Sequence, residues 1–206
     1  MLTRFKMWRD RRRQARAIYE SVVTQARTRS LYAKLGVPDT PEGRFEMVTL
    51  HLVLVLDRLE RAGEPGQRLA RTLTETFAVD LDDNFREMSV GDLAVPKHVR
   101  RGVAQLLERY NDYRAALTAD DATDAAGAEA PLTVAIQSRL TAVGAGQGLD
   151  AQGICAYIRR GRHRLGQEPT SAVLAGRIVW PHINSAEPDA HAAGMGAGMT
   201  EGEHAR

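Results

Sequence analysis

Histidine and cysteine, the side chains most often used for metal binding and nucleophilic catalysis, are few and scattered in this sequence. Cys155 is the only cysteine, so neither an intramolecular disulfide nor a cysteine-based zinc site can form. His51 lies in an apolar segment with no acid or second histidine three or four residues away, and the chain has no His-x-x-x-His pair and no Gly-x-Ser-x-Gly elbow. We therefore interpret His51 as a packed side chain rather than a metal ligand. We expect no enzyme activity, no metal and no cofactor.

Two further runs begin like ligand-binding motifs but do not complete them. The acidic run Asp80–Asn84 starts like a calcium loop, which needs glycine at position six and glutamate at position twelve. Those positions hold Phe85 and Gly91. The glycine run Gly144–Gly148 follows no predicted strand and precedes no lysine, so it meets no phosphate-binding fingerprint. We interpret the acidic run as a solvated helix face, with a basic partner as the alternative, and the glycine run as a loop.

The N-terminal segment combines many cations with aromatic residues. Its first sixteen residues contain seven arginines or lysines and one acid. Leu2, Phe5 and Trp8 recur at steps of three, and we expect a helix to gather them beside Met7, with the arginines on the other side. Such a helix is typical of attachment to an anionic membrane, the same charge suits the RNA of a ribosome, and a solvated helix start is an equal alternative. The candidate contact residues are Phe5, Trp8, Arg9, Arg11, Arg12, Arg13 and Arg16.

A second basic cluster, Arg159–Arg164, ends a predicted helix. Cations at that position offset the negative end of the helix dipole. A turn and another short helix follow, so a helix-turn-helix is an alternative, but its second helix, Thr170–Trp180, carries a single cation. A helical nucleic-acid-binding or regulatory protein that uses its arginine clusters is therefore the alternative function. We expect no specific DNA partner.

The composition is that of an ordinary globular chain built from helices. The 206 residues are 43% hydrophobic and 26% charged, only 5% are aromatic, and the formal net charge is +2. A core made mainly of aliphatic residues and alanine favours helix over sheet. The longest apolar run, Met47–Leu56, is much shorter than the roughly 20 residues that span a bilayer. We expect a cytoplasmic protein, peripheral at most on the inner face of the membrane.

Apolar spacing and turn residues divide the chain into helices. Four long helices are predicted at about 9–33, 41–62, 67–88 and 96–117, with shorter ones at 132–143, 151–165 and 170–180. The second long helix is apolar around nearly its whole circumference, so other helices must surround it. The predicted fold class is an all-α helical bundle. The side chains expected to be deeply buried are Leu50, Leu54, Leu73, Phe77 and Leu107.

These helices and the segments between them predict five parts of the chain. Residues 1–16 form the basic arm, 17–118 the core helical domain and 131–182 the C-terminal helices that pack on the core. Residues 119–130 are rich in alanine and aspartate and are predicted to be a linker. Residues 183–206 are mainly alanine, glycine, histidine and acid, and are predicted to be a disordered tail.

Two separate stretches of the sequence carry a recognisable pattern. The first is Leu31–Thr40 (LYAKLGVPDT), followed by Gly43–Met47 (GRFEM) and Leu50–Leu52 (LHL). The second is Phe85–Leu93 (FREMSVGDL), followed by Val95–Lys97 (VPK). Together they resemble the bacterial branch of the ubiquinol–cytochrome c chaperone family, over about residues 18–117 and more loosely to about 180.

The resemblance implies a non-enzymatic chaperone that helps to assemble the ubiquinol–cytochrome c oxidoreductase, respiratory complex III. Mitochondrial members look like assembly factors that act at the ribosomal tunnel exit and hold newly made cytochrome b before haem insertion. The implied partners are therefore cytochrome b and, through the arm, an anionic membrane surface or the ribosome. The family positions expected to bind the client or a partner are Phe45, His51, Asp92 and Leu93.

Overall fold

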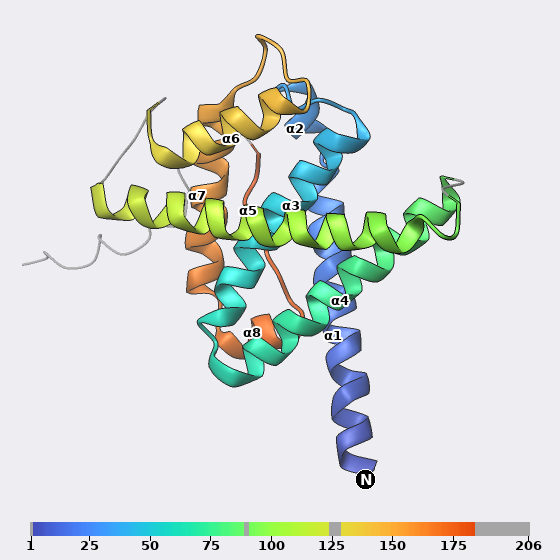
Figure 1. Cartoon of the computed structure of the whole chain (residues 1–206). Coiled ribbons are helices and arrows are strands. Elements are labelled where there is room, and N and C mark those ends of the chain that lie inside the picture. The colour runs from blue at the N-terminus through green and yellow to red at the C-terminus, as the bar shows by residue number, and fades with distance from the viewer. Residues whose placement is uncertain (1, 89–90, 124–128, 184–206) are drawn as a thin grey trace, which may run out of the picture.

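The computed structural model describes residues 2–88, 91–123 and 129–183, and all regular secondary structure in these ranges is helical. The helices are α1 (Leu2–Ala26), α2 (Arg29–Ala33), α3 (Pro41–Glu60), α4 (Gly63–Glu87), α5 (Val95–Thr123), α6 (Pro131–Ala142), α7 (Ala151–Gln167) and α8 (Thr170–Leu174). Figure 1 shows α3 in the middle and the long α5 crossing the molecule. The predicted all-α fold is confirmed. None of the described helices is both long enough and apolar enough to cross a bilayer.

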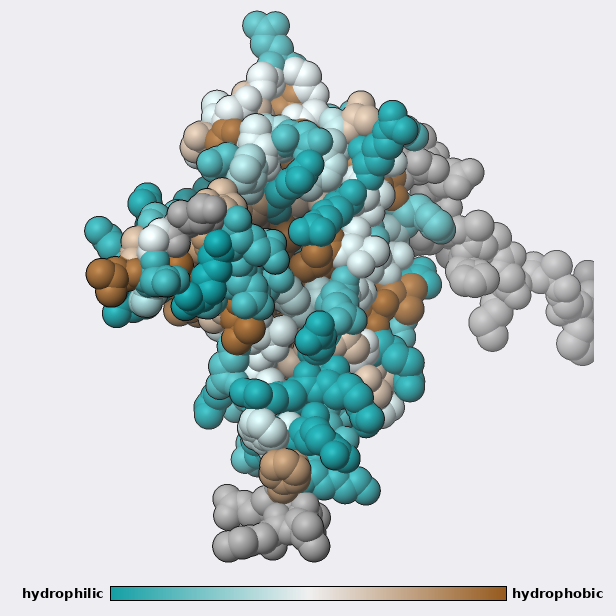
Figure 2. Space-filling model, turned by 90° about the vertical axis from the view of Figure 1, so that its right-hand side faces the viewer, coloured by the Kyte–Doolittle hydropathy of each residue, from teal (hydrophilic) through white to brown (hydrophobic). Residues whose placement is uncertain are grey.

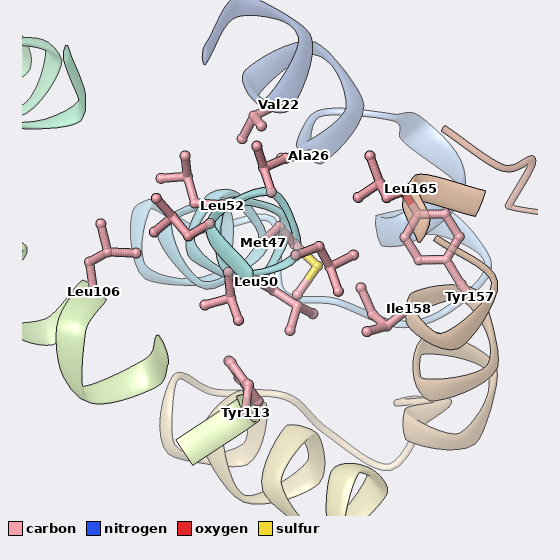
Figure 3. Close-up of a cluster of buried hydrophobic side chains, with 14 of the residues drawn as sticks. Val22, Ala26, Met47, Leu50, Leu52, Leu106, Tyr113, Tyr157, Ile158 and Leu165 are labelled. Carbon is pink, nitrogen blue, oxygen red and sulfur yellow. The ribbon is translucent and has the colours of Figure 1, made fainter. Parts of the chain in front are cut away.

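The other long helices are arranged around α3. It contacts α1, α4, α5, α6 and α7, and Figure 3 shows side chains converging on it from several sides. Its middle is buried around the whole circumference, from Leu50 through Leu56. Each large aliphatic side chain buried in this way contributes roughly 1.5–3 kcal/mol relative to an exposed one. The apolar pattern of this segment therefore explains why α3 becomes the centre of the core.

Local signals fix where α3 begins. The Thr40 hydroxyl accepts a hydrogen bond from the Gly43 N–H at 3.1 Å, and Pro41 occupies the first position of the helix, where no N–H is needed. A Cβ at Gly43 would lie 2.1 Å from the carbonyl oxygen of Pro38, so only glycine allows the chain to fold back this tightly. The cap and the glycine together aim α3 into the core.

The glycine- and proline-rich run at Gly63 begins a helix, whereas the sequence predicted a break before a helix at residue 67. Gly63 has φ of +70° and turns the chain between α3 and α4. Pro65 lies in the first turn of α4, where its missing N–H costs no hydrogen bond. A Cβ at Gly66 would lie 2.0 Å from the carbonyl oxygen of Leu59, so this glycine lets the two helices approach closely.

Two other predicted helices differ from the observed ones. The single helix expected at 9–33 is two helices, because Thr28 is extended and Tyr32 donates from its hydroxyl to the terminal carbonyl of Ala26 at 2.7 Å. The helix expected at 170–180 is the short α8, which ends at Leu174, shortly before Gly176 with its φ of +84°. In both places the break follows local backbone conformation that apolar spacing does not reveal.

The predicted core is confirmed at four of its five positions. Leu50, Leu54, Leu73 and Phe77 are all at most 2% exposed. Leu107 is 51% exposed, so its predicted burial is wrong, whereas its neighbour Leu106 is fully buried. Successive residues point about 100° apart on a helix, and α5 turns Leu106 towards the core. With two adjacent leucines, the spacing alone did not decide between them.

The segment predicted to be a linker is partly helical. α5 continues to Thr123, and within it Asp120 is only 5% exposed. Its carboxylate accepts hydrogen bonds from the Leu132 N–H at 3.3 Å and from Arg159 Nη2 at 2.5 Å. Residues 119–123 are therefore the last part of α5 rather than a linker. The remainder of that segment, 124–128, and residues 184–206 of the predicted tail lie outside the described residues. Ile183 itself is buried.

Candidate partner-binding surfaces

His51 lies at the centre of the core with every polar atom paired. Its Nδ1 is 2.7 Å from the carbonyl oxygen of Met47, one turn earlier, and its Nε2 is 2.8 Å from the hydroxyl of Tyr157 on α7. A carbonyl oxygen only accepts, so Nδ1 carries the proton and Nε2 accepts from Tyr157. The Tyr157 oxygen in turn accepts from Gln25 Nε2 at 2.9 Å. This chain of bonds joins α3, α7 and α1.

The neutral form of His51 is the one that fits this site. Burial lowers the pKa of His51 to about 4, and the hydrogen bond to the Met47 carbonyl opposes the shift. A protonated ring would donate to Tyr157 and leave that hydroxyl proton without an acceptor. His51 is completely buried, so its observed role in this folded state is to join three helices, and its contact with a client stays a prediction.

Phe45 lies half-buried beside a buried ion pair. Its ring is 6.1 Å from that of Phe77, and the guanidinium of Arg109 lies 5.5 Å from its centroid. Arg109 Nε donates to both carboxylate oxygens of Glu46, at 2.9 and 2.8 Å, and its Nη2 also bonds to Glu46. Both partners are nearly inaccessible, with Glu46 1% exposed and Arg109 6%. Phe45 therefore covers a charged contact between α3 and α5, with only part of its ring at the surface.

Asp92 and Leu93 lie at an exposed end of the molecule, between α4 and α5. Leu93 is 99% exposed and Met88, at the end of α4, is 64% exposed. Asp92 is also exposed, and its carboxylate accepts from Arg86 Nη1 at 2.9 Å. In Figure 1 this end projects to the right, away from α3. We call Met88, Asp92 and Leu93 the tip.

The basic arm is the start of α1 and projects from another part of the molecule. Figure 1 shows this helix continuing beyond the other elements at the lower end. Phe5 and Trp8 are exposed by 62% and 45%, with their rings stacked 6.0 Å apart. The cations Arg9, Arg12, Arg13 and Arg16 are exposed and Arg11 is partly so. The structure therefore brings the predicted arm residues together on one exposed helix.

The arrangement of side chains around this arm differs from the predicted one. Arg12 lies over the Trp8 ring at 4.3 Å from its centroid, so arginine and aromatic side chains share a face. Residues four apart are neighbours on a helix, whereas residues two apart, such as Phe5 and Met7, point to nearly opposite sides. The predicted separation of aromatic from basic side chains, and the grouping of Met7 with Phe5, are therefore wrong.

Several members of the other charged clusters of the sequence have partners within the fold. Tyr19 donates from its hydroxyl to the Asp80 carboxylate at 2.7 Å, which adds to burial in raising the pKa of Tyr19. Arg159 bonds to Asp120 and Arg162 to Asp121, so the second basic cluster ties α7 to the end of α5. Within the described ranges no three potential ligands are grouped as a metal site.

Sequence reasoning missed the charged side chains that are buried in the core. Glu46 and Asp57 lie on α3 and meet arginines from α5 and α7, namely Arg109, Arg114 and Arg162. The signal was present, because both acids interrupt an otherwise apolar face of the predicted central helix. These arginines from α5 and α7 lie 50 or more residues from the acids, so spacing along the chain could indicate only Arg61, which is four residues after Asp57 and pairs with it.

These features define an all-α protein with a closed polar centre and exposed apolar side chains at its ends. The chain belongs to the ubiquinol–cytochrome C chaperone family, because the family model with that description matches residues 33–180. The crystal structure of the Cbp3 homolog from Brucella abortus is similar to this chain, with a TM-score of 0.73 and 29% sequence identity. That similarity covers 89% of this chain and 98% of the other. No curated protein gives a significant match.

Proposed function

We propose that this protein is an assembly chaperone for respiratory complex III and that it binds newly made cytochrome b. The observation that carries the proposal is the family match over residues 33–180, which includes α3 to α8 and excludes α1 with the arm. The closed centre supports it, because the polar groups around His51 and Glu46 are already paired. A holding function needs an exposed apolar surface rather than a catalytic pocket.

The tip is the surface that we propose for the client. Leu93 and Met88 are large apolar side chains, and their exposure to water contributes nothing to the stability of the fold. Figure 2 shows the side of the molecule that carries the tip, with separate hydrophobic patches among hydrophilic residues. Small patches of this kind suit weak and reversible binding, as a client that must later be released requires. Phe45 and Asp92 remain candidate contact residues that would position the client rather than supply the main apolar contact.

Capture of cytochrome b tests the role of the tip. The full chain is used to precipitate newly made cytochrome b from detergent-solubilised membranes, and the double variant Met88→Ser/Leu93→Ser is compared with it. Burying these two side chains is worth roughly 1.5–3 kcal/mol each, so affinity should fall by about tenfold or more. Val79→Ser is the matched control, because Val79 is 60% exposed on α4. Undiminished capture by the double variant, or an equal loss in the control, would contradict the proposal.

We propose further that the arm attaches the chaperone to an anionic membrane on the cytoplasmic side. Phe5 and Trp8 can enter the interfacial region, and Arg12, stacked on Trp8, can reach lipid headgroups from the same face. Each arginine near an anionic surface adds about 1 kcal/mol. Neither contribution is large alone, so attachment should need both the aromatic side chains and the charge.

Liposome co-sedimentation tests the arm. Binding to vesicles with anionic lipid should fall with added salt and fall in the variant Phe5→Ala/Trp8→Ala, and it should be lost on neutral vesicles. A chain beginning at Gln14 should lose binding as well. Equal binding by that shortened chain would contradict the membrane role. Salt-sensitive binding to ribosomes without binding to vesicles would instead assign the arm to RNA.

A further inference from the structure

A small cleft lies between the C-terminal halves of α3 and α7. Its volume is about 270 Å³, and three of its seven lining residues are arginines: Arg58 from α3, Arg61 just after α3, and Arg162 from α7. The other lining residues are Leu54, Asp57, Leu165 and Gly166. Pockets for drug-sized molecules begin at roughly 300 Å³, so this cleft suits a small group. Three cations in so small a space indicate an anion.

Arg58 is fixed in the cleft by neutral acceptors. Its Nε donates to the carbonyl oxygen of Leu165 at 2.8 Å. Its Nη2 donates to the carbonyl oxygen of Glu168 and to the hydroxyl of Thr170, both at 3.0 Å. These bonds close the C-terminal end of α7 and hold the guanidinium in one orientation. None of these acceptors is a carboxylate, so these bonds do not neutralise the positive charge of Arg58.

The other two arginines share one buried acid. Arg61 Nη2 donates to the Asp57 carboxylate at 2.7 Å. Arg162 Nη1 donates to Asp121 at 2.6 Å, while its Nε lies 3.7 Å from the nearer Asp57 oxygen, beyond hydrogen-bond distance. That Nε is buried and has no hydrogen-bond partner in the described part of the chain. A buried donor on a charged group is costly to leave unpaired.

We propose that this cleft binds a phosphate group through Arg58, Arg61 and Arg162. A guanidinium offers parallel N–H donors that match the oxygens of phosphate, and it cannot lose its charge. Asp57 lines the same cleft and opposes an anion, so binding is weak and reversible. Two sources supply this chemistry, a free phosphate or phosphate ester and the headgroup of a phospholipid. The proposal does not depend on the client of the chaperone.

The cleft is connected to the base of the arm through α8. Arg58 bonds to Thr170 at the start of α8, and Gly176, just after α8, lies against α1. A Cβ at Gly176 would be 3.1 Å from the carbonyl oxygen of Gln14 and 3.4 Å from Ala17. In Figure 1, α8 and the arm lie at the same lower end of the molecule. A lipid phosphate bound in the cleft would therefore lie on the side from which the arm projects.

Titration of the intact chain with inorganic phosphate and with glycerol 3-phosphate, at constant ionic strength, tests the site by calorimetry. We expect saturable binding with one site per chain. Arg61→Gln and Arg162→Gln should each weaken it by about tenfold, the value of one hydrogen bond to a charged group. Arg164→Gln, an exposed cation on the same helix outside the cleft, should leave it unchanged. Asp57→Asn should tighten binding, because it removes the opposing charge, whereas a purely structural role would predict no gain.

Vesicles separate the two sources. If a phospholipid supplies the phosphate, Arg162→Gln should weaken co-sedimentation with vesicles of phosphatidic acid in phosphatidylcholine, and Arg164→Gln should not. If the source is a free phosphate, the titration should show the site and vesicle binding should not respond to Arg162→Gln. The proposal is overturned if neither phosphate compound binds saturably and vesicle binding is unchanged in Arg61→Gln and Arg162→Gln. It is also overturned if Arg164→Gln reduces binding as much as the cleft variants do.

Discussion

The centre of this protein and its ends treat polar and apolar groups in opposite ways. At the centre, Glu46 is paired with Arg109, and His51 bonds to Met47 and Tyr157, so these buried polar atoms have partners within α3 and from α5 and α7. At the ends, Leu93 and Phe5 are large apolar side chains with most of their surface exposed. The first arrangement stabilises a single packing of the helices. The second leaves surface that another molecule can cover.

This difference separates the residues that hold the fold from those that are free to bind. A substitution at the centre should reduce the free energy of unfolding, whereas one at the ends should leave it unchanged and affect only association. The proposed phosphate cleft combines both kinds of residue, because Asp57 is buried while Arg61 is exposed. Four experiments test this division, from the largest expected effect to the smallest.

Breaking the central ion pair should have the largest effect. Arg109→Met leaves the Glu46 carboxylate buried without its partner and should cost about 3–5 kcal/mol. Chemical denaturation of the variant measures this loss. The double variant Glu46→Gln/Arg109→Met should recover most of the stability, because no charge remains buried. Glu20→Gln, which removes the exposed pair with Arg16, should cost under about 1 kcal/mol. Equal losses for the two single variants would contradict the comparison.

The two adjacent leucines of α5 provide a matched pair. Leu106→Ala should cost about 2–5 kcal/mol, because it removes a fully buried side chain and leaves a cavity. Leu107→Ala should cost under about 1 kcal/mol, because half of that side chain is already in water. Thermal unfolding of both variants measures the difference. Similar melting temperatures would show that α5 is rotated relative to the structure described here.

His51 should make the protein less stable as the pH falls. Its pKa is about 4 in the folded protein and about 6.5 in the unfolded chain, so between these values the unfolded state binds more protons. The contribution is fully present above pH 6.5, decreases as the pH falls, and is lost near pH 4, in total about 3 kcal/mol. Denaturation at several pH values should show a steeper decline for the native chain than for His51→Gln. Identical slopes would show that the pKa of His51 is the same in the folded and unfolded states.

The smallest effect on stability is expected at the tip. Leu93→Ser should change the free energy of unfolding by no more than about 0.5 kcal/mol, since the side chain is 99% exposed. The same variant should bind cytochrome b less well. Denaturation and capture measured on one preparation give both values. A marked loss of stability would place Leu93 in a contact that the folded chain makes for itself.

The sequence predicted the fold and the composition of the core, because those depend on local patterns. The apolar circumference of α3 predicted its central position, and the four-residue spacing of Leu73 and Phe77 predicted their burial. The exposed arm was also visible as an unusual density of arginine beside Phe5 and Trp8.

The polar centre was not predictable, because its partners are distant in the chain. The apolar surroundings of His51 identified it as a packed residue, but nothing near it indicated Tyr157. The same holds for Glu46, whose partner Arg109 is 63 residues away. The placement of Arg12 over Trp8 also differed from the prediction. Arg12 follows Trp8 by four residues, which makes the two neighbours on a helix, so the arginines do not all lie on the side away from the aromatic rings.

The bond between His51 and Tyr157 also has a consequence for the synthesis of the chain. The two residues are 106 positions apart, so at 5–20 residues per second α3 leaves the ribosome roughly 5–20 s before α7 can cover it. During that interval a helix that is apolar on every side has no complete set of neighbours. This member of a chaperone family is thus itself a difficult nascent chain, because the core around α3 cannot close before α7 has been synthesised.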